Sequence, residues 1–299
     1  MSQDWKEKKE RSNPVTLHLI CWIALNTSRF IARAFLAPIT FYFYLTSSQV
    51  RTASGNYLRR IKGKTGTPWQ VAKHIYYFSA TILDRVYFLT DQFYRFEIKT
   101  HGLEYIEEQQ KSGQGCILLG AHLGSFELLR ALAVQNKIPF KILMYQDHNA
   151  MITKIFNSLN PEVANSVINL ANDNAMLEMN ECLTDGNIIG MLGDRYVEID
   201  KKVPCQLLGE TVEFPAGPIT LATITKVPVI FFCGVYCGKN KYEIHIEKIS
   251  DAKKLARNER EAYVKETTQK YVDRIEYYLK KYPYNWFNFY DFWQDEKKK

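Results

Sequence analysis

The pattern of apolar and polar positions changes at about residue 96. From there on, short apolar runs alternate with stretches of helical periodicity, and Gly, Pro or Asn bound several of them. The apolar runs predict strands at 116–120, 140–145, 167–171, 187–192, 227–236 and 242–249. Helices are expected between several of these strands, at 125–136, 174–184 and 217–225. This alternation predicts an α/β fold, with a mixed, largely parallel sheet flanked by helices.

Two longer segments also have helical periodicity. Residues 70–95 carry apolar side chains at helical spacing and predict one amphipathic helix. Near the C-terminus, apolar or aromatic positions and one threonine recur about every four residues, at Tyr263, Thr267, Tyr271, Ile275 and Leu279. We expect a second amphipathic helix there, which Pro283 ends.

The most apolar part of the chain is residues 14–48. Arg29 and Arg33 divide it into two arms, each shorter than the roughly 20 apolar residues that a straight membrane span needs. A pair of core helices would explain the pattern, but its apolar density exceeds what one buried helix face requires. We therefore expect a hydrophobic helical membrane anchor, with both arginines at headgroup level and a true span as an alternative. The expected division is a tail and anchor over 1–48, followed by an α/β domain over 49–299.

Charge and cysteine content narrow the choice of partners. The chain has 39 Lys and Arg against 32 Asp and Glu, and its net charge of +7 favours an acidic partner such as anionic lipid, an acidic carrier protein or nucleic acid. Residues 49–66 are basic and suit either a solvated helix or anionic lipid. The six cysteines contain no Cys-x-x-Cys pair, and the histidines show no ligand spacing. We expect a reducing compartment and no metal site.

The candidate chemistry lies in residues 115–129, GCILLGAHLGSFELL, where His122 follows an apolar strand and Glu127 comes five residues later. In a regular helix, this spacing would place the two side chains about 140° apart. They can cooperate if His122 lies in a turn and the helix starts near Gly124 or Ser125. Glu127 would then hold one ring nitrogen while the other takes a proton from an alcohol. The amides at the helix start would be available to an oxyanion or a phosphate.

Two alternatives remain open for this stretch. His122 could simply cap a helix, with Glu127 as an ordinary first-turn acid that the helix dipole favours. Ser125 could be a nucleophile beside a histidine, although the sequence around it is not a Gly-x-Ser-x-Gly elbow.

The arrangement His-x-x-x-x-Glu after an apolar strand resembles the signature of bacterial lysophospholipid acyltransferases and late (lauroyl or myristoyl) lipid A acyltransferases. The resemblance continues through 186–236, where an acidic turn, a Pro-x-Gly-Pro segment and an apolar strand follow one another. Including the apolar N-terminus, it covers roughly residues 15 to 290. Gln146 stands where the lipid A enzymes usually have an arginine, so the chain looks like a divergent branch, of the kind also found in pathways for lipids such as aryl polyene lipids.

The resemblance implies a membrane-associated acyltransferase on the cytoplasmic face of the bacterial inner membrane. It would move a fatty acyl group from an acyl-carrier-protein or coenzyme A thioester to a hydroxyl of a lipid or glycolipid. No cofactor and no nucleic-acid partner are implied. Two other functions are left open: a thioesterase that uses water as the acceptor, and an inactive homologue that binds lipid or carrier protein.

The resemblance also implies roles for individual residues. His122 would be the general base and Glu127 its orienting partner. Four further residues are expected to bind substrate: Gly124, Ser125, Asp194 and Arg195.

Overall fold

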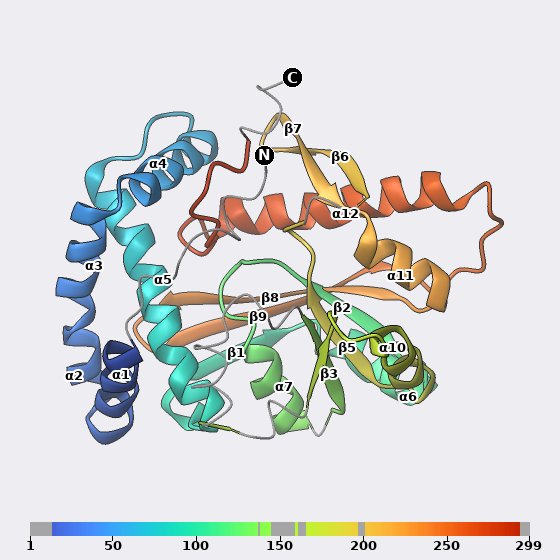
Figure 1. Ribbon diagram of the computed structural model, residues 1–299, viewed down its shortest axis with the longest axis horizontal. Helices are drawn as coiled ribbons and strands as arrows, with labels where there is room; N and C mark the ends of the chain where they lie inside the picture. The colour runs from blue at the N-terminus through green and yellow to red at the C-terminus, as the bar shows by residue number, and fades with distance from the viewer. Residues whose placement is uncertain (1–13, 137, 145–158, 161–165, 197–200, 294–299) are drawn as a thin grey trace.

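The computed structural model describes residues 14–136, 138–144, 159–160, 166–196 and 201–293. Gln146 therefore lies outside the described residues. A central sheet carries helices on both faces, and the N-terminal helices stand to one side, against a long helix (Figure 1).

The principal helices are α1 (Pro14–Asn26), α2 (Arg29–Ala34), α3 (Leu36–Thr46), α4 (Ser48–Lys62), α5 (Pro68–Leu89), α6 (Leu103–Ser112), α7 (Leu128–Asn136), α10 (Ala175–Thr184), α11 (Gly217–Thr225) and α12 (Arg260–Lys281). The strands are β1 (Glu97–His101), β2 (Cys116–Gly120), β3 (Phe140–Met144), β4 (Val167–Asn169), β5 (Ile188–Leu192), β6 (Lys202–Leu207), β7 (Glu210–Pro215), β8 (Val229–Gly238) and β9 (Lys241–Ser250).

The main sheet has seven strands in the order β1-β9-β8-β2-β5-β3-β4. Only β8 and β9 pair in antiparallel fashion, so the expected mixed and largely parallel α/β sheet is confirmed. Every strand predicted from an apolar run is present. The sequence did not predict β1 or the β6–β7 hairpin, because both carry polar residues in alternation and lack the continuous apolar run of a buried parallel strand.

Strand β2 lies at the centre of the sheet, and all five of its residues are buried. Ile117 and Leu119 belong to a core that includes residues of α11 and α12. Cys116 and Leu118 belong to a second core, with residues of α6 and α7. Because both faces of β2 are covered, its sequence is apolar throughout.

Helix α5 begins where its sequence directs. Thr67 and Gln70 form a reciprocal capping box, and Pro68 occupies the first turn. The helix ends at Leu89, so the expected single helix over 70–95 is too long. Asp91 has a φ of 56°, and a short 3₁₀ helix (Phe93–Arg95) follows. Helix α12 ends at Lys281, just before Pro283, as expected.

The expectation for Arg29 and Arg33 is wrong. Both guanidinium groups point inward and contact the carboxylate of Asp84 at 2.7 and 2.9 Å, and the Asp84 side chain is fully buried. Tyr242 donates a further hydrogen bond to this carboxylate at 2.9 Å. A buried carboxylate requires such compensation, so the arginines attach the N-terminal helices to the rest of the fold.

Among the helices that the structure describes, none alone combines the length and apolarity that a membrane crossing requires. A bent pair, Arg29–Thr46 with Ser48–Lys62 at 94°, meets those criteria jointly, by length and composition only.

Candidate active site

His122 lies in a tight turn just beyond the C-terminal end of β2. Gly124 adopts a φ of +76°, and a Cβ atom there would lie 2.0 Å from the carbonyl oxygen of Gly234. Both the conformation and the close approach require glycine. The Ser125 amide donates to the same carbonyl oxygen at 2.7 Å. The turn is thereby fixed against β8, and the position of His122 is fixed with it.

Asp194 is the partner of the His122 imidazole. Strand β5 pairs with β2, and the Gly193 amide donates to the Gly120 carbonyl at 2.9 Å, so the segments that follow the two strands meet. The His122 Nδ1 atom lies 2.7 Å from Asp194 Oδ1. The His122 backbone amide donates to Oδ2 of the same carboxylate at 3.0 Å. Asp194 therefore fixes both the backbone and the ring of His122.

The protonation states of this pair follow from its surroundings. Burial alone would raise the pKa of the Asp194 carboxyl, but the charges of His122 and Arg195 and the hydrogen bonds from His122 and Asn288 hold that pKa well below its usual value. Burial and then the Arg195 charge lower the pKa of His122, although Asp194 opposes them. A neutral imidazole beside an ionised carboxylate must donate from Nδ1. Nε2 then carries a lone pair and can act as a base.

The Nε2 atom makes no hydrogen bond to any residue within the described ranges. The His122 side chain is 27% exposed, whereas the Asp194 side chain is fully enclosed. The imidazole is therefore partly accessible to solvent, and its partner is kept away from solvent.

The segment that follows α12 holds this pair in place. Asn288 donates to Asp194 Oδ2 at 2.8 Å and accepts from Arg195 Nε at 2.8 Å. The Phe287 amide donates to the carbonyl of His122 at 2.8 Å, and the Gly124 amide donates to the carbonyl of Asn285 at 2.7 Å. The C-terminal segment thus completes the site through Asn285 and Asn288.

The roles of these two asparagines were not predicted from the sequence. Both are buried, at 1% and 3% exposure, within the aromatic run 282–293. A polar side chain buried among aromatic rings must find partners. Two asparagines three positions apart in such a run were the available signal.

Glu127 is not the partner of the imidazole in this structure. It immediately precedes α7, which begins at Leu128 rather than near Gly124 or Ser125. Its Oε1 lies 2.5 Å from Arg85 Nε, and its Oε2 accepts from the Ser125 hydroxyl at 2.8 Å. The expected contact fails because the helix starts later, so Glu127 faces α5 instead.

The residues expected to bind substrate are engaged within the protein. The amides of Gly124 and Ser125, expected to meet an oxyanion, are hydrogen-bonded to carbonyl groups. The Ser125 hydroxyl is bonded to Glu127, and the residue is only 1% exposed. Arg195 contacts Asn288 and, at 3.3 Å, the carbonyl of Phe287. In this structure these groups shape the turn around His122.

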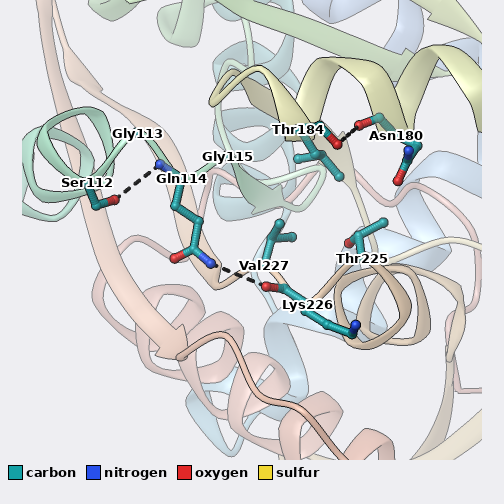
Figure 2. A pocket seen from close by; sticks show the side chains of 10 residues that line it. Ser112, Gly113, Gln114, Gly115, Asn180, Thr184, Thr225, Lys226 and Val227 are labelled. Atoms are coloured by element: carbon teal, nitrogen blue, oxygen red, sulfur yellow. Dashed lines mark hydrogen bonds between the residues drawn. The ribbon is translucent and has the colours of Figure 1, made fainter.

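A hollow on the surface lies near the N-terminal end of β2, whereas His122 lies beyond the C-terminal end of that strand. Its lining includes Gln114, just before β2, Asn180 of α10, and Lys226, shortly before β8 (Figure 2). Gln114 Nε2 donates to the Lys226 carbonyl at 3.4 Å. Lys226 supplies its one ionisable side chain. The hollow offers no paired acid and base, so the site at His122 is the stronger candidate.

A family model matches the greater part of the chain. The model of the bacterial lipid A biosynthesis acyltransferase family matches residues 71–295, which include the His122 turn, Asp194 and both asparagines. No curated protein shows significant sequence similarity to the chain. Because the match spans more than half of the chain, the protein belongs to the bacterial lipid A biosynthesis acyltransferase family.

Proposed function

We propose that the protein transfers a fatty acyl group from a thioester donor to a hydroxyl of a lipid or glycolipid, with His122 as the general base. The observation that carries this proposal is the contact of the His122 Nδ1 atom with the buried Asp194 carboxylate at 2.7 Å. The Nε2 atom of His122 makes no hydrogen bond to the described part of the chain. Such a base matches the proton transfer that acylation of an alcohol requires.

The proposed reaction proceeds in two steps. His122 Nε2 removes the proton from the acceptor hydroxyl as its oxygen attacks the thioester carbonyl, which forms a tetrahedral intermediate and an imidazolium. The intermediate then expels the donor sulfur, and the imidazolium returns the proton to it. The products are the ester and the free thiol. Asp194 remains ionised throughout and stabilises the imidazolium.

We propose that Glu127 acts as a positioning residue. It contacts Arg85 at 2.5 Å, and the charge of Arg85, like that of Arg195, contributes to the lowered pKa of His122. Two guanidinium groups near the imidazole favour negative charge on a neighbouring oxygen, such as the oxyanion of the intermediate. Glu127 would keep one of them in place.

We place the protein on the cytoplasmic face of the bacterial inner membrane, attached through α1–α3. Large apolar side chains on these helices are exposed, with Phe30 at 85%, Phe41 at 62% and Trp22 at 60%. We refer to the exposed set as the apolar face: Trp22, Phe30, Ile31, Phe35, Phe41, Tyr42, Phe43 and Leu45. Aromatic and aliphatic side chains in such numbers suit the boundary between headgroups and acyl chains.

Removing residues 1–48 would be a poor test of attachment, because it would leave the buried Asp84 without Arg29 and Arg33. A double change to the apolar face, Phe30→Ser with Phe41→Ser, keeps those contacts. We expect it to shift much of the protein from the vesicle fraction to the soluble fraction in a flotation assay. The matched control is Met176→Ser with Leu177→Ser, two exposed apolar residues of α10, which should change little. Unchanged flotation of the first variant would place the attachment elsewhere.

An acyl carrier protein is the preferred donor, because its acidic face would complement a chain of net charge +7. Arg60 is already paired with Glu210, and Arg51 contacts the Leu45 carbonyl. Arg59 and Lys64 are exposed. They are therefore the better positions for a reversal to Glu. We expect this pair of changes to raise the KM for the carrier several-fold at low salt, where screening is weak, and to leave kcat unchanged.

One assay separates the candidate functions. The full-length protein in lipid vesicles is given an acyl-carrier-protein or coenzyme A thioester, with and without added glycolipid, and free thiol and lipid products are measured. A transferase releases thiol together with an acylated acceptor. A thioesterase releases thiol and free fatty acid without an acceptor. An inactive binding protein releases neither, and that result in the presence of a suitable acceptor would contradict the proposal.

A further inference from the structure

A second histidine–carboxylate cluster lies on the outer strands of the sheet. His101 is the last residue of β1, and Glu243 and His245 lie two residues apart in β9, so their side chains share one face. Strands β1 and β9 pair in parallel, with His101 directly opposite His245. One ligating atom from each of the three side chains lies within 4.8 Å of the other two. Strand pairing thus assembles two imidazoles and a carboxylate.

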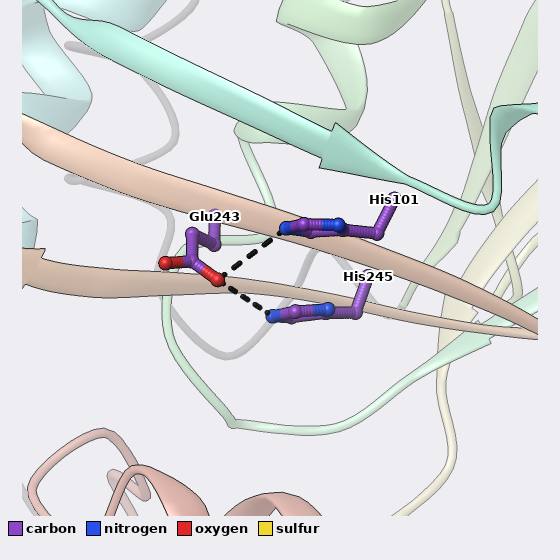
Figure 3. Close-up of side chains that lie close together, drawn as sticks. All are labelled: His101, Glu243 and His245. Atoms are coloured by element: carbon purple, nitrogen blue, oxygen red, sulfur yellow. Dashed lines mark ion pairs between the residues drawn. The ribbon is translucent and has the colours of Figure 1, made fainter.

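Both imidazoles point toward the same carboxylate oxygen (Figure 3). The Nε2 atom of His101 lies 3.5 Å from Glu243 Oε2, and the Nε2 atom of His245 lies 3.4 Å from it. Zinc bonds to such nitrogen and oxygen atoms at about 2.1 Å, so two ligands at the corners of a tetrahedron lie about 3.4 Å apart. Adjacent ligands of an octahedral ion at that bond length would lie about 3.0 Å apart. The spacing matches a tetrahedral ion.

The remaining distance, between the ligating nitrogens of His101 and His245, can change when a metal binds. The rings of His101 and His245 are stacked, with centroids 4.8 Å apart and planes at 6°. The His245 side chain is only 6% exposed and packs against Tyr278, whereas the His101 side chain is 48% exposed. Rotation of the exposed His101 ring can bring its nitrogen onto a shared ion. The same exposure leaves the fourth position open to water.

Tyr282 provides support around these ligands. Its hydroxyl donates to Glu243 Oε2 at 2.8 Å and lies 3.2 Å from His245 Nε2. Hydrogen bonds of this kind orient metal-ligating carboxylates. Tyr282 also immediately follows α12 and begins the segment that carries Asn285 and Asn288. An ion here would connect the edge strand β1, the strand β9 and the start of that segment.

We propose that His101, Glu243 and His245 form a binding site for a divalent transition metal, best matched by Zn²⁺. Two imidazoles and one carboxylate suit zinc, whereas calcium and magnesium prefer oxygen ligands. The site is structural. Strands β8 and β9 lie beyond β2 in the sheet, and at about 4.8 Å per strand β9 is roughly 10 Å from β2, too far for the ion to reach the atoms reacting at His122.

Local spacing in the sequence does not indicate this site, because its histidines lie far apart along the chain. The site does not depend on the proposed acyl transfer, and binding can be measured without any activity assay.

The test is a Zn²⁺ titration of metal-stripped, full-length protein in detergent at pH 7.5, against a competing metal indicator. We expect about one bound equivalent. His101→Ala and Glu243→Gln should each weaken binding by at least about 10–100-fold, the loss that changes to mere supporting residues already produce. His101 is exposed at the end of an edge strand, so its replacement should leave the fold intact. Zn²⁺ should raise the Tm of the wild type but not that of His101→Ala.

Two matched controls locate the ion. Glu97→Gln removes an exposed acid from the same strand β1, and His122→Ala removes an imidazole that faces a carboxylate elsewhere in the fold. Both should retain the wild-type Zn²⁺ affinity. The proposal is overturned if no equivalent binds, if His101→Ala binds as the wild type does, or if His122→Ala abolishes binding, since the ion would then lie in the catalytic site.

Discussion

Asp194 and Glu127 are the two carboxylates considered as partners of His122, and their surroundings differ. The Asp194 side chain is fully buried and accepts hydrogen bonds from the His122 ring, the His122 amide and Asn288. The Glu127 side chain is 16% exposed and contacts Arg85 and Ser125. Only Asp194 contacts the imidazole, although Glu127 is far closer along the chain. Proximity in sequence is therefore a poor guide to the partner of this histidine.

The order of strands in the sheet explains why Asp194, and not Glu127, contacts His122. In a parallel sheet, the segments that follow neighbouring strands emerge at the same edge, and β2 and β5 are hydrogen-bonded neighbours. Asp194 follows β5 as closely as His122 follows β2, so the two side chains meet across the strands. Glu127 immediately precedes α7 and contacts Arg85 of α5 instead.

The largest expected effect tests the base itself. His122→Ala should lower kcat by about 10²–10⁴, the usual contribution of a general base, because the variant lacks the proposed proton acceptor. Thiol release in the presence of acceptor lipid measures it. A variant with near-normal turnover and an unchanged circular dichroism spectrum would remove His122 from the mechanism.

A smaller effect is expected at Asn288, which donates a hydrogen bond to the Asp194 carboxylate. Asn288→Ala removes one hydrogen bond to Asp194 and one to Arg195. A hydrogen bond to a charged group contributes about 1.5–3 kcal/mol, so we expect kcat to fall about 10-fold or somewhat more. Asn180→Ala, at an exposed position of α10, is the control. If Asn288→Ala changes neither kcat nor Tm, the C-terminal segment does not support the site.

The smallest expected effect is a shift in the pH dependence of kcat/KM. The pKa of His122 is lowered by burial and then by Arg195, so the wild type should stay active below pH 6.5 and lose activity only as pH falls through the lowered pKa. Arg195→Gln removes one of these causes, so the pKa should rise and the acid limb of kcat/KM should move to higher pH. Arg59→Gln, at an exposed arginine, should leave the profile in place. An acid limb that moves to lower pH in Arg195→Gln would contradict this electrostatic account.

The sequence predicted the buried part of the fold well and its polar edges poorly. Strands such as β2 and β8 are continuous apolar runs because both of their faces are covered. Strand β1, Glu-Ile-Lys-Thr-His, is an edge strand with one neighbour and has no such run. Its pairing with β9 depends on tertiary structure, which local patterns do not encode.

Local sequence patterns were equally limited in predicting the contacts of the site. The apolar strand and the glycine turn identified His122, because both are local features. The partners of His122, Arg29 and Arg33 lie 72, 55 and 51 residues away in sequence. Local spacing predicted a partner for His122 five residues away and both arginines at headgroup level. Contacts across a sheet or between helices leave no such local signature.

The most direct test of the central claim, that Asp194 rather than Glu127 orients the base, compares two isosteric changes in one assay. Asp194→Asn and Glu127→Gln each replace a carboxylate with an amide of the same shape, and both are measured by kcat with the same thioester donor and acceptor lipid. In Asp194→Asn the ring loses the acceptor that selects the Nδ1–H form, so we expect kcat to fall by about 10² or more. Glu127→Gln should cost about 10-fold or less. A nearly active Asp194→Asn protein together with a nearly inactive Glu127→Gln protein would contradict the account.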